Sequence, residues 1–139
     1  MQKALLTPLF CLMMSACSDN STVNIYDKKI TQTKMPCMKL LVFPPNEKIE
    51  NYLKTQYSFD ANCSYTLEVA TKSGIICNSN QNYQTKALGA FPTSYLKMQI
   101  TENKKLQYSY YRDLNEEVEV SDVERAIKRI SEDLVFFSK

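Results

Sequence analysis

The feature that most restricts the fold of this chain is a regular alternation of apolar and polar residues over residues 94–113. Three apolar residues alternate with polar ones on each side of Asn103, a pattern typical of β-strands with one buried face. A turn centred near Asn103 predicts a hairpin that places all six apolar side chains on the same face of the sheet. The expected facing pairs are Ile100–Leu106, Met98–Tyr108 and Leu96–Tyr110.

Three other segments predict strands. Residues 38–43 form a short continuous apolar run that ends at Pro44–Pro45, which is typical of a buried strand. Residues 63–71 alternate in polarity like the hairpin. The Ser73–Gly74 turn predicts that residues 75–78 return beside them as a short second strand.

Two segments have the apolar period of helices. Asn46 is a capping residue at the start of residues 46–57, where Ile49, Tyr52 and Leu53 form a narrow apolar stripe. In the C-terminal segment, residues 121–124 predict a capping box. The apolar stripe that follows consists of Val123, Ala126, Ile127, Ile130 and Leu134.

The predicted order is strand, helix, four strands, helix. This order predicts an α+β fold: a small two-layer sandwich with a mostly antiparallel sheet and two helices on one face. The chain of 139 residues is the usual length of one domain. We expect that domain to span residues 37–139.

The N-terminal segment has a composition of its own. Lys3 precedes an apolar stretch from Ala4 to Met14, and the small residues Ser15 and Ala16 then lead directly to Cys17. The stretch is too short to span a bilayer and has the form of a secretory signal. It resembles the lipobox of bacterial lipoproteins, in which a peptidase cleaves after a small residue and the next cysteine carries diacylglycerol.

This resemblance implies a division of the chain. Residues 1–16 would be a lipoprotein signal peptide, Cys17 the lipidated residue, and the polar residues 17–36 a flexible tether. The alternative for residues 22–26 is a short edge strand. Ser18 follows the cysteine, whereas Asp at that position favours retention in the inner membrane in enteric-type sorting. The resemblance therefore implies a lipid anchor in the outer membrane, with the domain facing the periplasm.

Three cysteines remain in the expected mature domain, and a secreted location permits disulfides. Cys37 and Cys63 each precede a predicted strand, with the helix of residues 46–57 between the two strands. A strand–helix–strand unit makes its strands parallel, so neighbouring strands would start side by side. We predict a Cys37–Cys63 disulfide, with Cys77 a buried free thiol; the alternative is an exposed, reactive cysteine.

The sequence lacks the residues that several kinds of functional site require. The sequence has no histidine and only two glycines, which excludes His-dependent catalysis and a Gly-rich phosphate loop. A net charge of +2 is too small for a nucleic-acid footprint. Acidic residues cluster at 113–119, where a solvated connection is the expected role and acid–base catalysis or calcium binding the alternative. We expect no catalytic residue, metal or cofactor.

The best candidates for a binding surface are aromatic. The alternation places Tyr108 and Tyr110 in the core and Tyr95 and Tyr111 on the outer face. Tyr is common in protein interfaces because it buries a large area at a low entropy cost. The C-terminal run that contains Phe136 and Phe137 either packs under the sheet or binds a partner.

These observations predict a non-catalytic, lipid-anchored accessory or assembly protein of the bacterial cell envelope. Its partners would be the membrane, through the N-terminal lipid, and another envelope protein. One alternative is an envelope enzyme or thiol-redox protein that uses a free cysteine or the acidic cluster. The other is a surface inhibitor or exclusion lipoprotein.

Overall fold

A five-stranded mixed sheet organises the chain. The computed structural model describes residues 20–76 and 91–135. The strands lie in the order β1-β5-β4-β3-β2, in which β2 and β3 are parallel and the other neighbours are antiparallel. With its helices, this sheet confirms the α+β class and the mostly antiparallel pairing. The elements are β1 (Ser21–Ile25), a 3-10 helix (Lys28–Thr31), β2 (Lys39–Phe43), α1 (Glu47–Gln56), β3 (Tyr65–Lys72), β4 (Ser94–Glu102), β5 (Lys105–Leu114) and α3 (Val120–Asp133).

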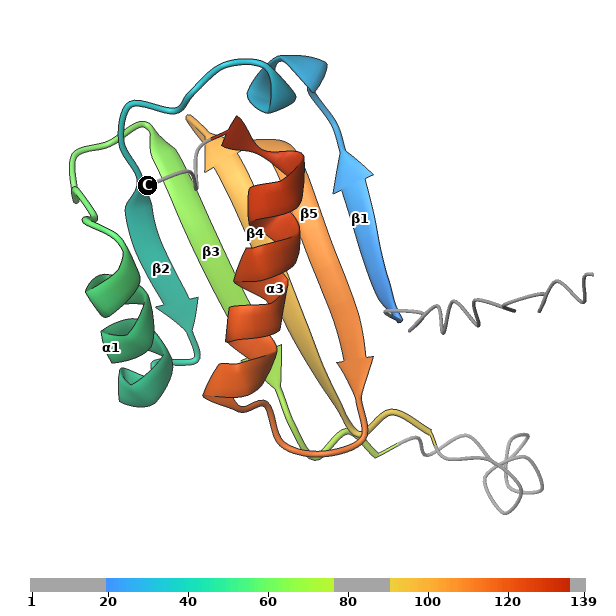
Figure 1. The fold of residues 1–139 in the computed structure, drawn as a ribbon. Coiled ribbons are helices and arrows are strands. Elements are labelled where there is room, and N and C mark those ends of the chain that lie inside the picture. The colour runs from blue at the N-terminus through green and yellow to red at the C-terminus, as the bar shows by residue number, and fades with distance from the viewer. Residues whose placement is uncertain (1–19, 77–90, 136–139) are drawn as a thin grey trace, which may run out of the picture.

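Helix α3 lies in front of the central strands, and α1 lies beside it near the β2 edge (Figure 1). The two helices contact each other, and α3 also contacts β4. The predicted apolar stripe of α3 is buried, with Val123, Ala126 and Ile130 fully inaccessible. These residues pack in one core with the inward-facing side chains of the sheet.

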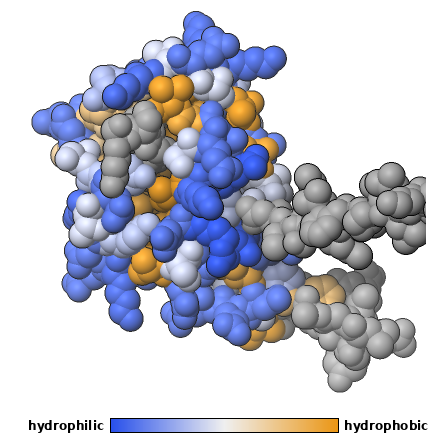
Figure 2. Space-filling view, in the orientation of Figure 1, coloured by the Kyte–Doolittle hydropathy of each residue, from blue (hydrophilic) through white to orange (hydrophobic). Residues whose placement is uncertain are grey.

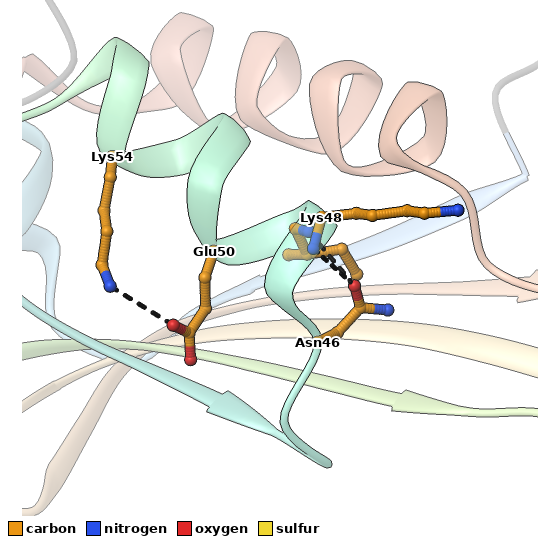
Figure 3. A network of polar contacts seen from close by, with 5 residues as sticks. Asn46, Lys48, Glu50 and Lys54 are labelled. Atoms are coloured by element: carbon orange, nitrogen blue, oxygen red, sulfur yellow. Dashed lines mark hydrogen bonds and ion pairs between the residues drawn. The ribbon is translucent and has the colours of Figure 1, made fainter.

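Both helices begin with side-chain caps. The Asn46 side chain accepts hydrogen bonds from the backbone N–H groups of Lys48 and Ile49, at 3.1 and 3.2 Å (Figure 3). The capping box of α3 is not at the predicted residues 121–124. It begins two residues earlier, where the Glu119 N–H donates to Asp122 Oδ2 at 3.0 Å.

The hairpin forms, but its predicted register is wrong. The turn consists of Asn103 and Lys104, both with positive φ. The register then shifts between Ile100 and Thr101, because Gln107 of β5 is an extra residue between their partners. The apolar pairs therefore shift by two residues. Ile100 faces Tyr108, and Met98 faces Tyr110. A two-residue shift preserves the face of each side chain, so these four residues are still fully buried. The prediction is wrong for Leu106, which pairs with Thr101, the outward-facing neighbour of Ile100, and is only half-buried.

The predicted return strand at residues 75–78 is wrong for its described part. Ile75 and Ile76 belong to no strand, and Cys77 and Asn78 lie outside the described residues. Instead, β3 pairs directly with β4 over its whole length. The Ile75 N–H donates to the Thr93 carbonyl at 2.8 Å, so the segment after β3 and the segment before β4 lie side by side beyond the ends of these strands.

The flexible tether predicted for residues 17–36 is also wrong over its described part. Ser21–Ile25 form β1, which pairs antiparallel with β5 at the edge of the sheet. Asp27 caps the 3-10 helix that follows, and Ile30 and Met35 are buried in the core. The folded domain therefore begins near Ser21 and not at residue 37.

Candidate functional site

The face of the sheet turned away from α3 carries the candidate site. On β4, Leu96, Met98 and Ile100 point into the core and are fully buried. The alternate residues of β4, Tyr95 and Lys97, are half-buried on the other face. The side of the molecule that carries the helices is largely hydrophilic, with hydrophobic residues visible in smaller groups along its middle and at its upper end (Figure 2).

Tyr95 and Tyr111 lie together on this face, as neighbours on β4 and β5. Lys97 is the cross-strand partner of Tyr111, and Asp113 is the partner of Tyr95. The two tyrosine rings are therefore diagonal neighbours, with centroids 5.6 Å apart and planes inclined by 32°. The sequence prediction that both face outward, while Tyr108 and Tyr110 are buried, is confirmed.

A hydrogen bond fixes one of these rings. The Tyr111 hydroxyl donates to Asp113 Oδ1 at 2.8 Å. This hydrogen bond, with smaller contributions from burial and from the charge of Asp113, raises the pKa of Tyr111 to about 12. The phenol is therefore neutral at physiological pH, and its ring is held in place beside Tyr95.

The strand at the edge of the sheet adds apolar side chains that were not predicted to be exposed. Residues 38–43 were expected to form a buried strand, but β2 lies at the edge of the sheet. Leu41 and Phe43 are 49% and 70% exposed, whereas Val42 between them is buried. The continuous apolar run does not show which residues are exposed, because that depends on the position of the strand in the sheet.

The cross-strand register joins these residues into one surface. Phe43 pairs with Ala70, Ala70 with Lys97, and Lys97 with Tyr111. We call Phe43, Ala70, Tyr95, Lys97 and Tyr111 the tyrosine surface. Its aromatic rings are of the kind enriched in the core of protein interfaces, and Lys97 adds one positive charge among them.

A groove of about 620 Å³ lies at one end of this surface. Phe43 and Pro44 line one side, Lys72 and Tyr95 the other, and Ala70 lies between them. The small side chain of Ala70 leaves room between Phe43 and Tyr95. Such a groove is able to hold an apolar side chain of a partner near the ammonium group of Lys72.

The predicted disulfide is present. Cys37 and Cys63 are bonded, with Cα atoms 5.8 Å apart. They precede β2 and β3, which are parallel neighbours as the prediction required. The bond joins the starts of these two strands, at the end of the sheet opposite to the groove.

Other predicted residues lie outside the described part of the chain: Cys17, Cys77, Phe136 and Phe137. Over residues 20–76 and 91–135, there is no group of three side chains with the composition of a metal site. Within the same ranges, no helix has the length and apolar character needed to span a membrane. The acidic residues Glu116, Glu117 and Glu119 are exposed between β5 and α3.

Comparisons with known proteins assign no family. No family model matches the chain, and no curated protein or solved structure is significantly similar to it.

Proposed function

We propose that this chain is a non-catalytic, lipid-anchored accessory protein of the bacterial cell envelope, which binds another envelope protein through the tyrosine surface. The observation that carries the binding role is the cluster of Tyr95, Tyr111 and Phe43 on one exposed face. Aromatic residues supply much of the binding energy in protein interfaces. Lys97 within the cluster favours a partner with a carboxylate near its own apolar contact.

The envelope location rests on the N-terminal pattern. Met14–Ser15–Ala16–Cys17 follows an apolar segment of signal-peptide length, and Ser18 favours the outer membrane over the inner one. A Cys37–Cys63 disulfide suits the oxidising periplasm.

We also infer that the domain is a two-layer sandwich, with α1 and α3 in one layer and the sheet in the other. The contact between the two helices and the burial of their facing stripes support this arrangement. The charge of Glu124 on α3 contributes, after burial, to the raised pKa of Tyr52 on α1, as expected for helices packed side by side. In this arrangement the tyrosine surface lies on the face of the sheet that neither helix covers.

The anchor is tested by intact-mass analysis of the full-length protein extracted from membranes. Acylation adds the mass of diacylglycerol to a chain that begins at Cys17. Cys17→Ser abolishes this addition and releases the protein from the membrane fraction. An unmodified chain that retains residues 1–16 contradicts the proposal.

The binding surface is tested with a photo-crosslinking amino acid in intact cells. Placed at Leu41, beside the tyrosine surface, it gives a discrete adduct that Tyr95→Ala and Tyr111→Ala together reduce at least tenfold. The control position is Glu132, which is exposed on α3. Adducts of equal yield at Leu41 and Glu132, or an adduct that does not respond to the tyrosine substitutions, contradict a partner at this face.

A further inference from the structure

The position of β1 limits how far the domain can lie from its anchor. This step rests on the proposed acylation of Cys17. Ser21, the first residue of β1, is four residues after Cys17. A fully extended chain covers about 14 Å over four residues. If a tether of about 19 residues preceded the domain, its orientation would be free. With β1 in the sheet, the end of the sheet where β1 begins lies close to the bilayer.

The strand register identifies the other residues at this end. Ser21 pairs with Arg112, which pairs with Leu96 near the start of β4. Lys72, the last residue of β3, pairs with Tyr95. Strand β2 runs parallel to β3 and ends at the same side. Figure 1 shows this arrangement at its lower end, where β2, β3 and β5 finish and β1 and β4 start.

Three large apolar side chains project from this end. Phe43 at the end of β2 is 70% exposed, Ile76 after β3 is 78% exposed, and Phe91 before β4 is 38% exposed. The hydrogen bond from Ile75 to Thr93 holds the segments of Ile76 and Phe91 next to each other. Exposed apolar side chains at the end of the domain where a short linker leads to a lipid anchor are suited to insertion at the membrane interface.

The charges at this end indicate which lipids it contacts. Glu116, Glu117 and Glu119 are exposed in the connection between β5 and α3, and Glu117 lines the same groove as Phe43 and Lys72. Carboxylates are repelled by anionic headgroups. The contact therefore depends on apolar insertion into zwitterionic phospholipid and not on attraction to an anionic surface.

We propose that the end of the sheet that carries Phe43, Ile76 and Phe91 rests on the phospholipid bilayer in which Cys17 is anchored. The sheet then stands upright on the membrane. Phe43 then contacts the bilayer, and the rest of the tyrosine surface faces sideways, toward partners that are held in or near the same membrane.

Fluorescence quenching by lipids tests this orientation. The full chain, in a Cys77→Ser background, receives one cysteine at Phe43 or Phe91, and an environment-sensitive dye is attached. Tyr26 at the opposite end, 57% exposed, provides the matched control position. Each labelled protein is extracted from membranes and reconstituted into phosphatidylcholine vesicles that contain nitroxide-labelled lipid.

The expected result is that dyes at positions 43 and 91 shift to shorter emission wavelengths and lose at least half of their intensity, whereas the dye at position 26 changes little. Equal quenching at both ends overturns the proposal. A wavelength shift without lipid quenching also overturns it, because a protein or a second copy then covers this end.

Mass analysis of the same samples tests the lipid anchor separately from the orientation of the domain. An acylated Cys17 without quenching at positions 43 and 91 rejects the orientation and leaves the anchor in place. An unacylated Cys17 rejects the anchor, and the orientation with it.

Discussion

The hydroxyl of Tyr108, on the interior strand β5, donates a hydrogen bond of 2.7 Å to Asp133 Oδ2 at the end of α3. This bond joins the sheet to the last turn of the helix. Burial, followed by this hydrogen bond, raises the pKa of Tyr108. Asp133 also contacts Arg129, with Nε 3.4 Å from Oδ2. The carboxylate therefore has partners on two elements.

Removing this hydroxyl measures its contribution. Tyr108→Phe should lower the free energy of unfolding by about 1–2 kcal/mol, toward the lower end of the range for hydrogen bonds to charged groups, because Asp133 keeps Arg129 as a partner. Tyr111→Phe removes a similar bond, to Asp113, at an exposed site, and should cost less than about 0.5 kcal/mol. Denaturant titration of both variants checks the difference. Equal costs would contradict the role of burial.

Tyr111 makes the stability dependent on alkaline pH. Its pKa is raised to about 12 in the folded protein, whereas in the unfolded chain it is about 10. Between these values the unfolded state loses its proton first, so this contribution is fully present below about pH 10 and is lost as the pH rises to about 12.

NMR titration of the Tyr111 ring gives the midpoint directly. Asp113→Asn removes the carboxylate charge, so the midpoint should move down toward 10. An unchanged midpoint in that variant would show that Asp113 does not cause the shift.

The Cys37–Cys63 bond closes a loop with a sequence separation of 26. In the chain-entropy model, a loop of this length stabilises the folded state by roughly 3–4 kcal/mol. Cys37→Ala with Cys63→Ala should lower the free energy of unfolding by this amount, measured by denaturant titration under non-reducing conditions. The control is Cys77→Ala alone; peptide mapping that shows Cys77 bonded to either partner would contradict this assignment.

Ile130 tests the packing of α3. Its side chain is fully buried, so Ile130→Ala should cost about 2–5 kcal/mol, as other large-to-small core substitutions do. Glu132→Ala, on the exposed side of the same helix, is the matched control and should change stability by less than about 0.5 kcal/mol. If both variants unfold at the same denaturant concentration, the helix does not pack on the sheet.

Local sequence patterns predicted the structural features that depend on residues near in the sequence. They failed for features that depend on pairing with distant segments. The stripes of both helices and the two faces of β4 followed from spacing, and the disulfide followed from the strand–helix–strand order. The faces of β5 followed only beyond its bulge, because Gln107 is buried and Leu106 is not. The position of β2 at an edge did not, because Leu41 and Phe43 are exposed only by the order of the strands.

The start of the domain shows the same limit. Ser21–Ile25 are short and polar, so their sequence offered a strand only as the alternative to a flexible tether. They form one because β5 offers a free edge for pairing. This long-range pairing also changes the predicted distance between the lipid anchor and the domain.

The hairpin turn offers a final prediction. Asn103 and Lys104 have φ values of 49° and 68°, and a two-residue turn of this kind favours Gly at its second position. A left-handed conformation costs a non-glycine residue roughly 1–2 kcal/mol, which is partly offset by the entropy that glycine loses on folding. Lys104→Gly should therefore raise the free energy of unfolding by about 0.5–1 kcal/mol. Lys105→Gly, one residue later in β5, should lower it, and stabilisation by both variants would show that loss of charge, and not backbone conformation, is the cause.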